Sequence, residues 1–370
     1  MITISRHKKE DRLMSENKSI IGSINVTSTD IKCPGCGTSI GISFDPVTAS
    51  LKCPFCGLST QLPTPQNGAV AEELDFNSAL QRASVDWGHY KKLIVCSNCG
   101  GQSVYDSEQV TGACPFCGST SVTPAAETDQ IMVPNGVIPF SISKEQTQDL
   151  FINFAKKKGL VNKKVFDCKL EQVVGFYVPY WTFDTYTASY YYAYRDLGTA
   201  GYDHINGNWY QYINDVAVFA SDRLCHPFIK RIQKFDFDKA VPYSPDYLAG
   251  IPAERYTLGL NEGWECSKKQ ITTILKKAVH RFNRHLSVEE IATNYYNVRF
   301  RYLLAPIYFA TYKFGKKTFP VAINGQTGET YCDVPTNIKK IILFGTIALI
   351  VAAILEFLFI LAVAPYIPWR

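Results

Sequence analysis

The alternation of hydrophobic and polar residues divides the chain into three regions. Short alternating segments, separated by Cys, Gly and Pro, fill the chain up to residue 124. Longer alternating segments follow over 125–336, and a nearly unbroken hydrophobic run occupies 341–364. Alternation with period two is typical of half-buried β-strands, whereas a long unbroken run is typical of a membrane-spanning helix.

The region 125–336 predicts an antiparallel sheet with helices inserted between its strands, an α+β domain. The segments "NWYQYINDVAVFAS" and "RFRYLLAPIYFATYKF" are rich in aromatic and branched residues, which favour strands. The segment "TFPVAINGQTGETYCDV" predicts a hairpin that turns around Asn324-Gly325.

One strand, "TYTASYYYAYRD", has two faces of different chemistry. One face carries mostly aromatic residues and the other mostly small polar ones: Tyr186, Ala188, Tyr190, Tyr192 and Tyr194 against Thr185, Thr187, Ser189 and Arg195. We expect the tyrosine face to pack inside the protein. A platform that stacks bases or holds a lipid headgroup is the alternative.

Helical periodicity is present in two shorter segments. In "SISKEQTQDLFINFAKKKGL", Ser143 and Gln146 have the spacing of a capping box, and Gly159 marks the end of the helix. Its apolar stripe consists of Leu150, Phe151, Phe154 and Ala155. In the linker 63–90, apolar residues near helical spacing predict a short amphipathic helix: Leu74, Phe76, Leu80, Ala83 and Trp87.

The segment "CSKKQITTILKKAVHRFNRHL" predicts an amphipathic helix with a one-sided charge. Its apolar face consists of Ile271, Ile274, Leu275, Ala278, Val279, Phe282 and Leu286. The basic residues around it are candidate contacts for an anionic surface: Lys268, Lys269, Lys276, Lys277, Arg281 and Arg284. Anionic lipid and a nucleic-acid backbone both suit such a face. A solvated helix surface is the default interpretation.

The hydrophobic run predicts one transmembrane helix over 338–364, with an external tail at 365–370. The run is about 36 Å long as a helix, which exceeds the roughly 30 Å hydrocarbon core. Lys339 and Lys340 precede the run, and Arg370 ends the chain. This bias places the N-terminal domains in the cytoplasm of a single-pass, tail-anchored protein. Glu356 would lie inside the span, so it is a candidate intramembrane contact with a partner helix or a second copy.

The cysteine content and the N-terminal residues predict a metal site and a cellular compartment. Eight of the twelve cysteines form four CxxC pairs between Cys33 and Cys117. Repeated CxxC pairs are typical of metal sites rather than of disulfide frameworks. No signal peptide is evident in the N-terminal tail 1–30, so we expect a reducing cytoplasm; Met14 is a second candidate start. The net charge of +5 permits an anionic partner without requiring one.

The CxxC pairs predict two zinc ribbons, over 31–62 and 91–124. The ligand sets are Cys33, Cys36, Cys53 and Cys56, then Cys96, Cys99, Cys114 and Cys117. Their spacing matches the template for structural zinc within a residue. Four thiolates leave no open coordination position, so we expect two structural Zn²⁺ ions. Redox CxxC motifs and buried free thiols are the alternatives, and His89 is not needed as a ligand.

The segments between the cysteine pairs predict hairpins. "SIGISFDPVTASLK" turns at Asp45-Pro46, and "QSVYDSEQVTGA" turns near Ser107-Glu108. The first loop carries little charge and the second is slightly acidic, with Asp106 and Glu108. A surface that binds phosphate is normally basic, so the ribbon loops favour protein partners over nucleic acid.

These features together resemble a family of bacterial membrane-anchored proteins with TFIIB-type zinc ribbons. The resemblance covers the ribbons, the C-terminal run and the phrases "VIPFSISKEQ", "GFYVPYWTFD", "VPYSPDYLAGIPAERY" and "RYLLAPIYFATYKFGKKTFPVAINGQTGE". Members are often labelled primosomal (superfamily II) helicases. Some are similar to proteins encoded beside flotillin-like SPFH scaffolds and phage-shock-type membrane-stress proteins. The resemblance implies recruitment or stabilisation of such a complex at the membrane, and only the eight ribbon cysteines carry over as functional residues.

The residues argue against catalysis and leave two hypotheses. A helicase needs a GxxxxGK[ST] phosphate loop, and "GKK" at Gly315 lacks its glycine spacing and its Ser/Thr. Adjacent Cys225 and His226 come with no oxyanion-hole signal. We therefore expect a non-enzymatic scaffold or adaptor that binds protein partners, with self-association possible. A protein that binds nucleic acid is the alternative.

Overall fold

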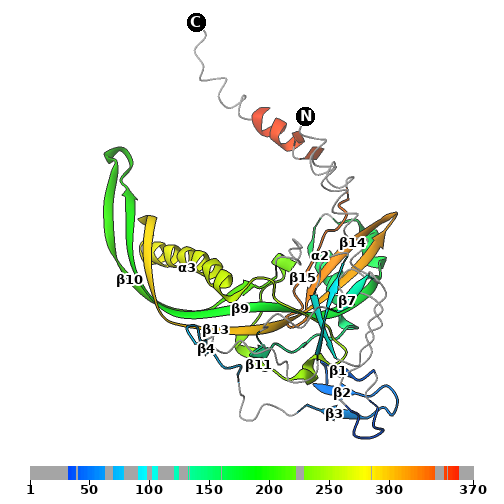
Figure 1. Ribbon diagram of the computed structural model, residues 1–370. Coiled ribbons are helices and arrows are strands. Elements are labelled where there is room, and N and C mark those ends of the chain that lie inside the picture. Colours follow the sequence, from blue (N-terminus) through cyan, green and yellow to red (C-terminus); the bar gives the residue numbers. More distant parts are fainter. Residues whose placement is uncertain are drawn as a thin grey trace.

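The computed structural model describes residues 32–38, 41–62, 70–78, 91–97, 102–106, 121–124, 132, 134–159, 161–221, 229–284, 286–337, 346–347 and 349–357. The strands of these residues form two sheets. A small sheet of β1 (Ser43–Asp45), β2 (Ser50–Lys52) and β3 (Ser59–Gln61) belongs to the first cysteine cluster, and a 12-stranded sheet contains the others. Figure 1 shows a compact body and a long curved arm that leaves it.

The large sheet is ordered β11-β8-β13-β9-β12-β6-β5-β7, with β10 beside β9, and β4 and β14 beside β13. Its strands are β4 Leu74–Asp75, β5 Lys91–Cys96, β6 Gln102–Asp106, β7 Val122–Pro124, β8 Gly136–Val137, β9 Leu170–Asp196, β10 Tyr202–Phe219, β11 Val241–Pro242, β12 Ala253–Glu254, β13 Leu286–Phe314, β14 Lys317–Asn324 and β15 Thr330–Cys332. The pairs β12–β9 and β13–β8 are parallel and the other pairs are antiparallel. The predicted hairpin at Asn324 is confirmed as β14 and β15.

Two very long strands, β9 and β13, extend through both the body and the arm. They pair antiparallel from Leu286–Arg195 at one end to Tyr312–Leu170 at the other. With β10 they form the arm, which we define as 185–196, 202–213 and 286–296 (Figure 1). Bulges interrupt β10 after Ile213 and β13 after Tyr296, where the arm meets the body. A bulge increases local twist, which suits the bend seen there.

Helix α3 (Leu260–Phe282) covers the inner face of the arm (Figure 1). Ile271, Leu275 and Val279 are buried against the strands, as the sequence pattern predicts for part of this face. Ile274 and Phe282 are exposed instead, and Leu286 already begins β13. The chain therefore reverses direction within a few residues at the tip of the arm.

The two faces of the arm are reversed from the prediction. Small polar residues lie buried beneath α3, and seven tyrosines of the opposite face are exposed. The buried hydroxyls are hydrogen-bonded: Thr187 donates to the Gln211 carbonyl at 2.7 Å, and Ser189 lies 2.9 Å from the Thr293 hydroxyl. A satisfied hydroxyl can be buried at little cost, and small side chains let a helix approach the sheet.

Helix α2 (Gln146–Lys157) forms as the capping box predicts. The Ser143 amide donates to Gln146 Oε1 at 2.8 Å, and the Gln146 amide lies 3.4 Å from the Ser143 hydroxyl. Phe151 and Ala155 are fully buried. Short 3₁₀ turns connect the remaining elements: η3 Lys163–Asp167, η4 Gly198–Ala200, η5 Ile229–Arg231, η6 Phe237–Lys239 and η7 Pro245–Leu248.

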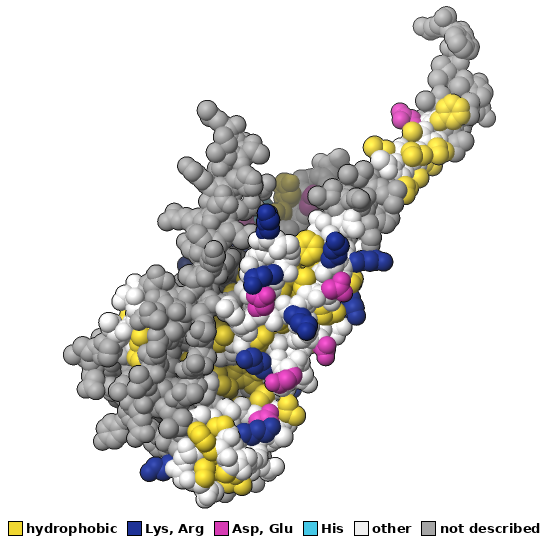
Figure 2. Space-filling view, turned by 90° about the vertical axis from the view of Figure 1, so that its right-hand side faces the viewer, with side chains coloured by type: hydrophobic (Ala, Val, Ile, Leu, Met, Phe, Trp, Pro, Cys, Tyr) yellow, Lys and Arg dark blue, Asp and Glu magenta, His cyan; other side chains and the backbone are white. Residues whose placement is uncertain are grey.

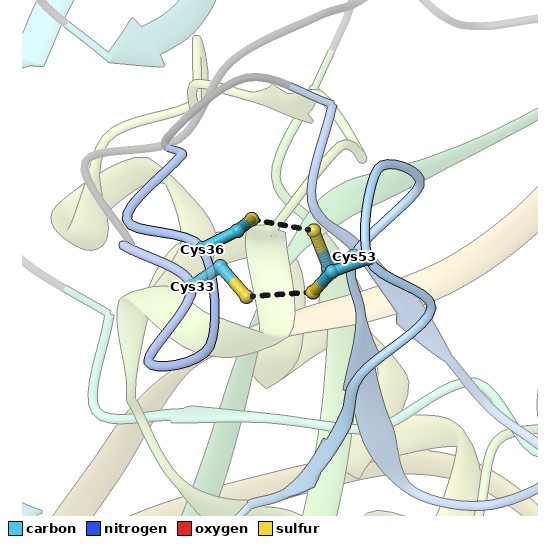
Figure 3. Close-up of side chains that lie close together, drawn as sticks. Cys33, Cys36 and Cys53 are labelled. Carbon is cyan, nitrogen blue, oxygen red and sulfur yellow. Dashed lines mark hydrogen bonds between the residues drawn. The ribbon is translucent and has the colours of Figure 1, made fainter.

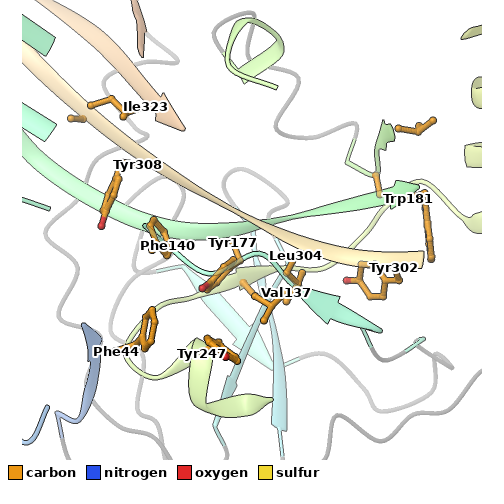
Figure 4. Packing of buried hydrophobic residues seen from close by; sticks show 14 of the residues in the cluster. Phe44, Val137, Phe140, Tyr177, Trp181, Tyr247, Tyr302, Leu304, Tyr308 and Ile323 are labelled. Atoms are coloured by element: carbon orange, nitrogen blue, oxygen red, sulfur yellow. The ribbon is translucent and has the colours of Figure 1, made fainter. Parts of the chain in front are cut away.

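The main core lies where β9 and β13 cross the body, and it is largely aromatic (Figure 4). Trp181 is fully buried and packs 4.9 Å from the ring of Tyr302, measured between centroids. Phe140 lies 5.2 Å from Tyr177 and 4.8 Å from Tyr308. Tilted and edge-on aromatic pairs of this kind stabilise a core beyond the area that they bury.

The linker 63–90 differs from its predicted helix in the part that the structure describes. Leu74–Asp75 form β4, which pairs with Arg299 and Phe300 of β13. Phe76 packs between Phe183, Trp264 and Phe300. Pairing with an open strand and burial of an aromatic ring outweigh weak helical periodicity. Residues 79–90, including Leu80, Ala83 and Trp87, lie outside the described residues.

The predicted fold class, two zinc ribbons, an α+β domain and a transmembrane helix, is wrong. The described structure is mostly antiparallel sheet, and within it no helix is both long and apolar enough to cross a membrane. Among the described residues of the predicted span, 346–347 and 349–357 are helical, fewer than the roughly 20 that a span needs. The predicted helix 338–364, and the single-pass localisation that rested on it, are corrected accordingly.

The described residues at 346–357 are exposed, and hydrophobic side chains gather there (Figure 2). On the body in the same view, Lys and Arg are interspersed with Asp and Glu. Residues 1–31, 338–345 and 358–370 lie outside the described residues, so the predicted N-terminal and external tails do as well.

Candidate metal centre and basic hollow

Two knuckles with the same backbone pattern carry the first four cysteines. The amide of Gly37 donates to the Cys33 carbonyl at 2.8 Å, and that of Gly57 donates to the Cys53 carbonyl at 3.1 Å. Both glycines have positive φ, 73° and 72°. Only glycine adopts this conformation without strain, which explains why each CxxC pair is followed by one.

The small sheet joins the two knuckles. The predicted hairpin at Asp45 is confirmed as β1 and β2, which pair from Ser43–Lys52 to Asp45–Ser50. Asp45 stabilises the turn because its carboxylate accepts from the Val47 amide at 3.0 Å and from the Thr48 hydroxyl at 2.9 Å. Lys52 forms an ion pair with the same carboxylate. The turn brings the second knuckle opposite the first.

The four sulfurs form a compact cluster (Figure 3). Cys33 Sγ lies 3.5 Å from Cys56 Sγ, and Cys36 Sγ lies 3.6 Å from Cys53 Sγ, while all four lie within 4.8 Å of one another. A tetrahedral zinc ion with Zn–S bonds of about 2.3 Å separates its sulfurs by about 3.8 Å. Cys33, Cys36, Cys53 and Cys56 are therefore close enough to bind one metal ion.

Backbone amides prepare part of this cluster for a cation. The N–H of Cys56 is the main reason that the pKa of Cys53 is lowered from 9.0 to about 6. The N–H of Cys36 likewise lowers the pKa of Cys33. At Cys56 the Leu58 amide favours a lower pKa. Other effects outweigh it, among them the hydrogen bond with Cys33, and the pKa of Cys56 is raised to about 12. Thiolate is the form that binds metal, so the two lowered thiols favour its entry.

The first ribbon is packed against the body. Phe44 of β1 lies edge-on to Tyr247 of η7, with 5.5 Å between ring centroids, and its amide donates to the Ala249 carbonyl at 3.1 Å (Figure 4). A Cβ on Gly250 would come within 3.2 Å of Ser43. The first ribbon therefore contacts the loop between η7 and β12, and metal binding at the knuckles is linked to the structure of this loop.

The second cysteine set is described at Cys96 alone, which is buried at the end of β5. Cys99, Cys114 and Cys117 lie outside the described residues, as does the predicted turn at Ser107-Glu108. The flanking strands pair antiparallel in the order β6-β5-β7. One metal site is supported, and the second zinc ion stays a prediction.

The six basic candidates, five on α3 and Arg284 just after it, separate into two groups. Lys268 forms an ion pair with Glu265 at 2.6 Å and lies 5.6 Å from the centroid of the Trp264 ring, while Lys269 is exposed nearby. The other four line an open hollow of about 500 Å³ at the tip of the arm. Its lining, which we call the basic hollow, is Lys276, Lys277, His280, Arg281, Arg284 and Val288.

Sequence reasoning missed two residues of the basic hollow. His280 lies one helical turn from Lys276 and Arg284, so its spacing could have indicated the position. Its Nδ1 lies 2.7 Å from the Leu286 carbonyl, which fixes the ring. Val288 belongs to β13, and no sequence pattern predicts that the chain reverses to bring it beside the helix.

Glu356, the candidate intramembrane contact, is exposed within 349–357. No hydrogen bond or ion pair joins it to another described residue. Because the predicted span is corrected, the intramembrane role proposed for this carboxylate is withdrawn with it.

Comparison with known proteins gives one relative and no family. The uncharacterized protein YdjG of Bacillus subtilis (strain 168) is 26% identical over 230 residues. The match covers 57% of this chain and 66% of the relative, just under two thirds of its length. No family model matches the chain, and no solved structure is similar to it. The chain is therefore similar to YdjG, and the zinc-ribbon family stays a prediction.

Proposed function

We propose that the protein is a non-enzymatic scaffold or adaptor, and that the arm is its main protein-binding surface. The observation that carries this proposal is the exposed tyrosine face of the arm. It consists of Tyr186, Tyr190, Tyr192, Tyr202, Tyr210, Tyr212 and Tyr296. Tyrosine is enriched where proteins bind one another, because it offers a large contact area and a hydroxyl at a small cost in entropy.

The tyrosines form a continuous surface across three strands. Tyr296, Tyr186 and Tyr212 lie in one row of the β13–β9–β10 register, and the rings of Tyr186 and Tyr212 are 4.7 Å apart. Exposed Asn206, Asn208 and Asn294 lie between them. Uncharged donors and acceptors among aromatic rings suit a protein surface better than they suit phosphate, which needs cations.

The edge of β10 offers a way to bind a partner's backbone. In the described structure, β10 pairs with β9 alone, so its other edge has no strand beside it. The strand contains neither Pro nor Lys, residues that commonly block pairing at an edge. An extended partner segment could add as a further strand, with its side chains over the tyrosine face.

The cysteine cluster supports a structural role for the metal. Four thiols around one ion leave no position for water or substrate, so the metal's contribution is to fold the ribbon. The partner class suggested by the family resemblance is an SPFH-type scaffold protein.

Affinity purification from cells tests the proposal. The variant Tyr202→Ser/Tyr210→Ser removes two well-exposed rings, 63% and 73% accessible, without opening the core. We expect it to lose the protein partners of the wild type. Phe55→Ser, 68% accessible on the ribbon, is the matched control and should retain them.

The purification also separates the alternatives. Partners that disappear after nuclease treatment would support nucleic-acid binding in place of the scaffold function. Partners lost in Phe55→Ser but kept in the arm variant would move the binding surface to the ribbon. No reproducible partner for the wild type would contradict the proposal.

A further inference from the structure

The basic hollow collects positive charge that no ion pair with a described residue neutralises. Lys277, Arg281 and Arg284 are exposed and make no hydrogen bond or ion pair with another described residue. The Lys276 ammonium donates to the Glu289 carbonyl at 2.6 Å. This acceptor is a neutral backbone group, so it does not balance the charge of the lysine. No carboxylate of the described residues lines the hollow.

A further basic group lies at the same end of the arm. Arg195 of β9 pairs in register with Leu286, the first residue of β13. Its Nε is buried and has no hydrogen-bond partner among the described residues. Buried donors are normally satisfied, so this guanidinium nitrogen is open to an acceptor outside the described residues.

An ordinary helix end explains only part of this arrangement. Cations near a helix C-terminus are stabilised by the helix dipole, which accounts for one or two basic residues in the last turn of α3. It does not account for Arg284 beyond the helix, or for a hollow of about 500 Å³ between the helix and β13. That volume is within the range of small-molecule sites.

We propose that the basic hollow binds a compact oligophosphate, a ligand with two or more linked phosphate groups. Arginine and lysine together suit phosphate, since guanidinium groups bind two oxygens at once and ammonium groups act as point charges. Among the described residues, the lining contains Val288 as its one apolar residue and no Phe, Tyr or Trp. The phosphates, rather than an attached base or acyl group, therefore provide the recognition.

This site is separate from the tyrosine face. It lies on the side of the arm that α3 covers, whereas the tyrosines lie on the opposite side. Oligophosphate binding goes beyond the scaffold function and does not depend on it. Inorganic polyphosphate and the phosphate chain of a nucleotide share this chemistry, so the test includes both.

Calorimetric titration of the purified full-length protein tests the inference, with tripolyphosphate as the probe. The variant Lys277→Gln/Arg281→Gln/Arg284→Gln removes the three charges without a partner. It leaves Lys276 and His280, whose contacts hold the tip together, in place. We expect the dissociation constant to rise by about tenfold or more, because charge-assisted hydrogen bonds are lost.

The matched control carries the same change of charge elsewhere. Lys156→Gln/Lys157→Gln/Lys316→Gln replaces three exposed lysines on α2 and the β13–β14 turn. We expect its affinity for tripolyphosphate to stay within about twofold of the wild type. Equal thermal stability of the two triple variants shows that both are folded.

Each remaining outcome decides the inference. ATP that binds as tightly as tripolyphosphate, with the same dependence on the hollow, supports it and identifies a nucleotide as one source. If both triple variants bind tripolyphosphate equally more weakly than the wild type, the effect is one of net charge and the proposed site is overturned. The absence of binding would also overturn it, as would a single-stranded oligonucleotide that binds far more tightly through the same three residues.

Discussion

Asp184 shows how burial changes the chemistry of one side chain. It lies in β9 at the base of the arm, where its Oδ1 accepts from the Asp215 amide at 2.6 Å. Asp215 in turn bonds to the guanidinium of Arg301. Loss of solvation is the main reason that the pKa of Asp184 is raised from 3.8 to about 7. The nearby Glu73 adds to this rise, while the hydrogen bond from the Asp215 amide opposes it.

This pKa predicts a pH dependence of stability. Between pH of about 4 and 7 the folded state holds a proton at Asp184 that the unfolded state releases, so the free energy of unfolding falls as pH rises. The slope is at most about 1.4 kcal/mol per pH unit. Asp184→Asn removes this titration. In urea unfolding, the wild type should lose stability relative to the variant from about pH 5 to 7.

The comparison is made at matched ionic strength, and above pH 8 the difference should become constant. A wild type that gains stability relative to Asp184→Asn over the same interval would show that Asp184 is ionised in the fold. Asp215, Glu73 and Arg301 remain in both proteins, so the comparison isolates the contribution of Asp184.

The knuckle glycines give a second prediction for single residues. A Cβ on Gly57 would meet no atom within 4 Å, so Gly57→Ala costs only the strain of positive φ, about 1–2 kcal/mol. We expect weaker metal retention, measured as zinc released to a colorimetric chelator. Gly159→Ala is the control, because that position is equally open and lacks positive φ. Equal zinc release from both variants would contradict the strained knuckle.

At the scale of elements, α3 decides which face of the arm is buried. Its residues Ile271 and Leu275 are fully buried, while Ile274 on the same helix is 38% accessible. The helix also contacts Trp209 of β10 through Phe282, at 5.6 Å between centroids. The arm is therefore a two-layer unit, and its inner layer depends on one stripe of the helix.

Substitutions along α3 test this unit. Ile271→Ala or Leu275→Ala should each lower the free energy of unfolding by about 2–5 kcal/mol, because each leaves a cavity. Ile274→Ala should cost less than about 1 kcal/mol, since its side chain is partly solvated. The measurement is denaturant unfolding followed by tryptophan fluorescence. Equal losses at all three positions would mean that α3 does not pack as described.

At the scale of the whole molecule, the first ribbon and the body share one core. Cys33, Cys53 and Phe44 belong to the same buried cluster as Tyr177 and Trp181. A small metal module is usually independent of its neighbours, but here its folding contributes to the packing of η7. Metal removal should therefore also loosen the packing of η7, outside the ribbon.

Chelation of the purified protein tests this link. Removing the metal should increase hydrogen exchange at 43–61 and also at 247–251, because the Phe44–Tyr247 contact and the bond to the Ala249 carbonyl are lost. Tyr247→Ala should give the increase at 247–251 while the metal stays bound. Exchange that changes in the ribbon alone after chelation would show that the two units are independent.

Features with local causes could be predicted from the sequence. The CxxC spacing and the trailing glycines placed four thiols together, the Ser143–Gln146 pair began a helix, and period two marked Tyr186–Tyr194 as a strand. The sequence also located four of the five basic residues of the hollow. Each of these follows from backbone geometry within a few residues or from a fixed spacing along the chain.

Which surfaces meet depends on the fold as a whole. The strand pattern shows that tyrosines and hydroxyls lie on opposite faces, but α3 covers the hydroxyl face because those groups bond across the strands. β4 formed where β13 offered an open edge, and Val288 joined the hollow through a reversal of the chain. The hydrophobic run predicted a span from apolarity alone, whereas no helix among the described residues is long and apolar enough to cross a membrane. Contacts between distant segments depend on which partners are available in space, and a linear pattern does not contain that information.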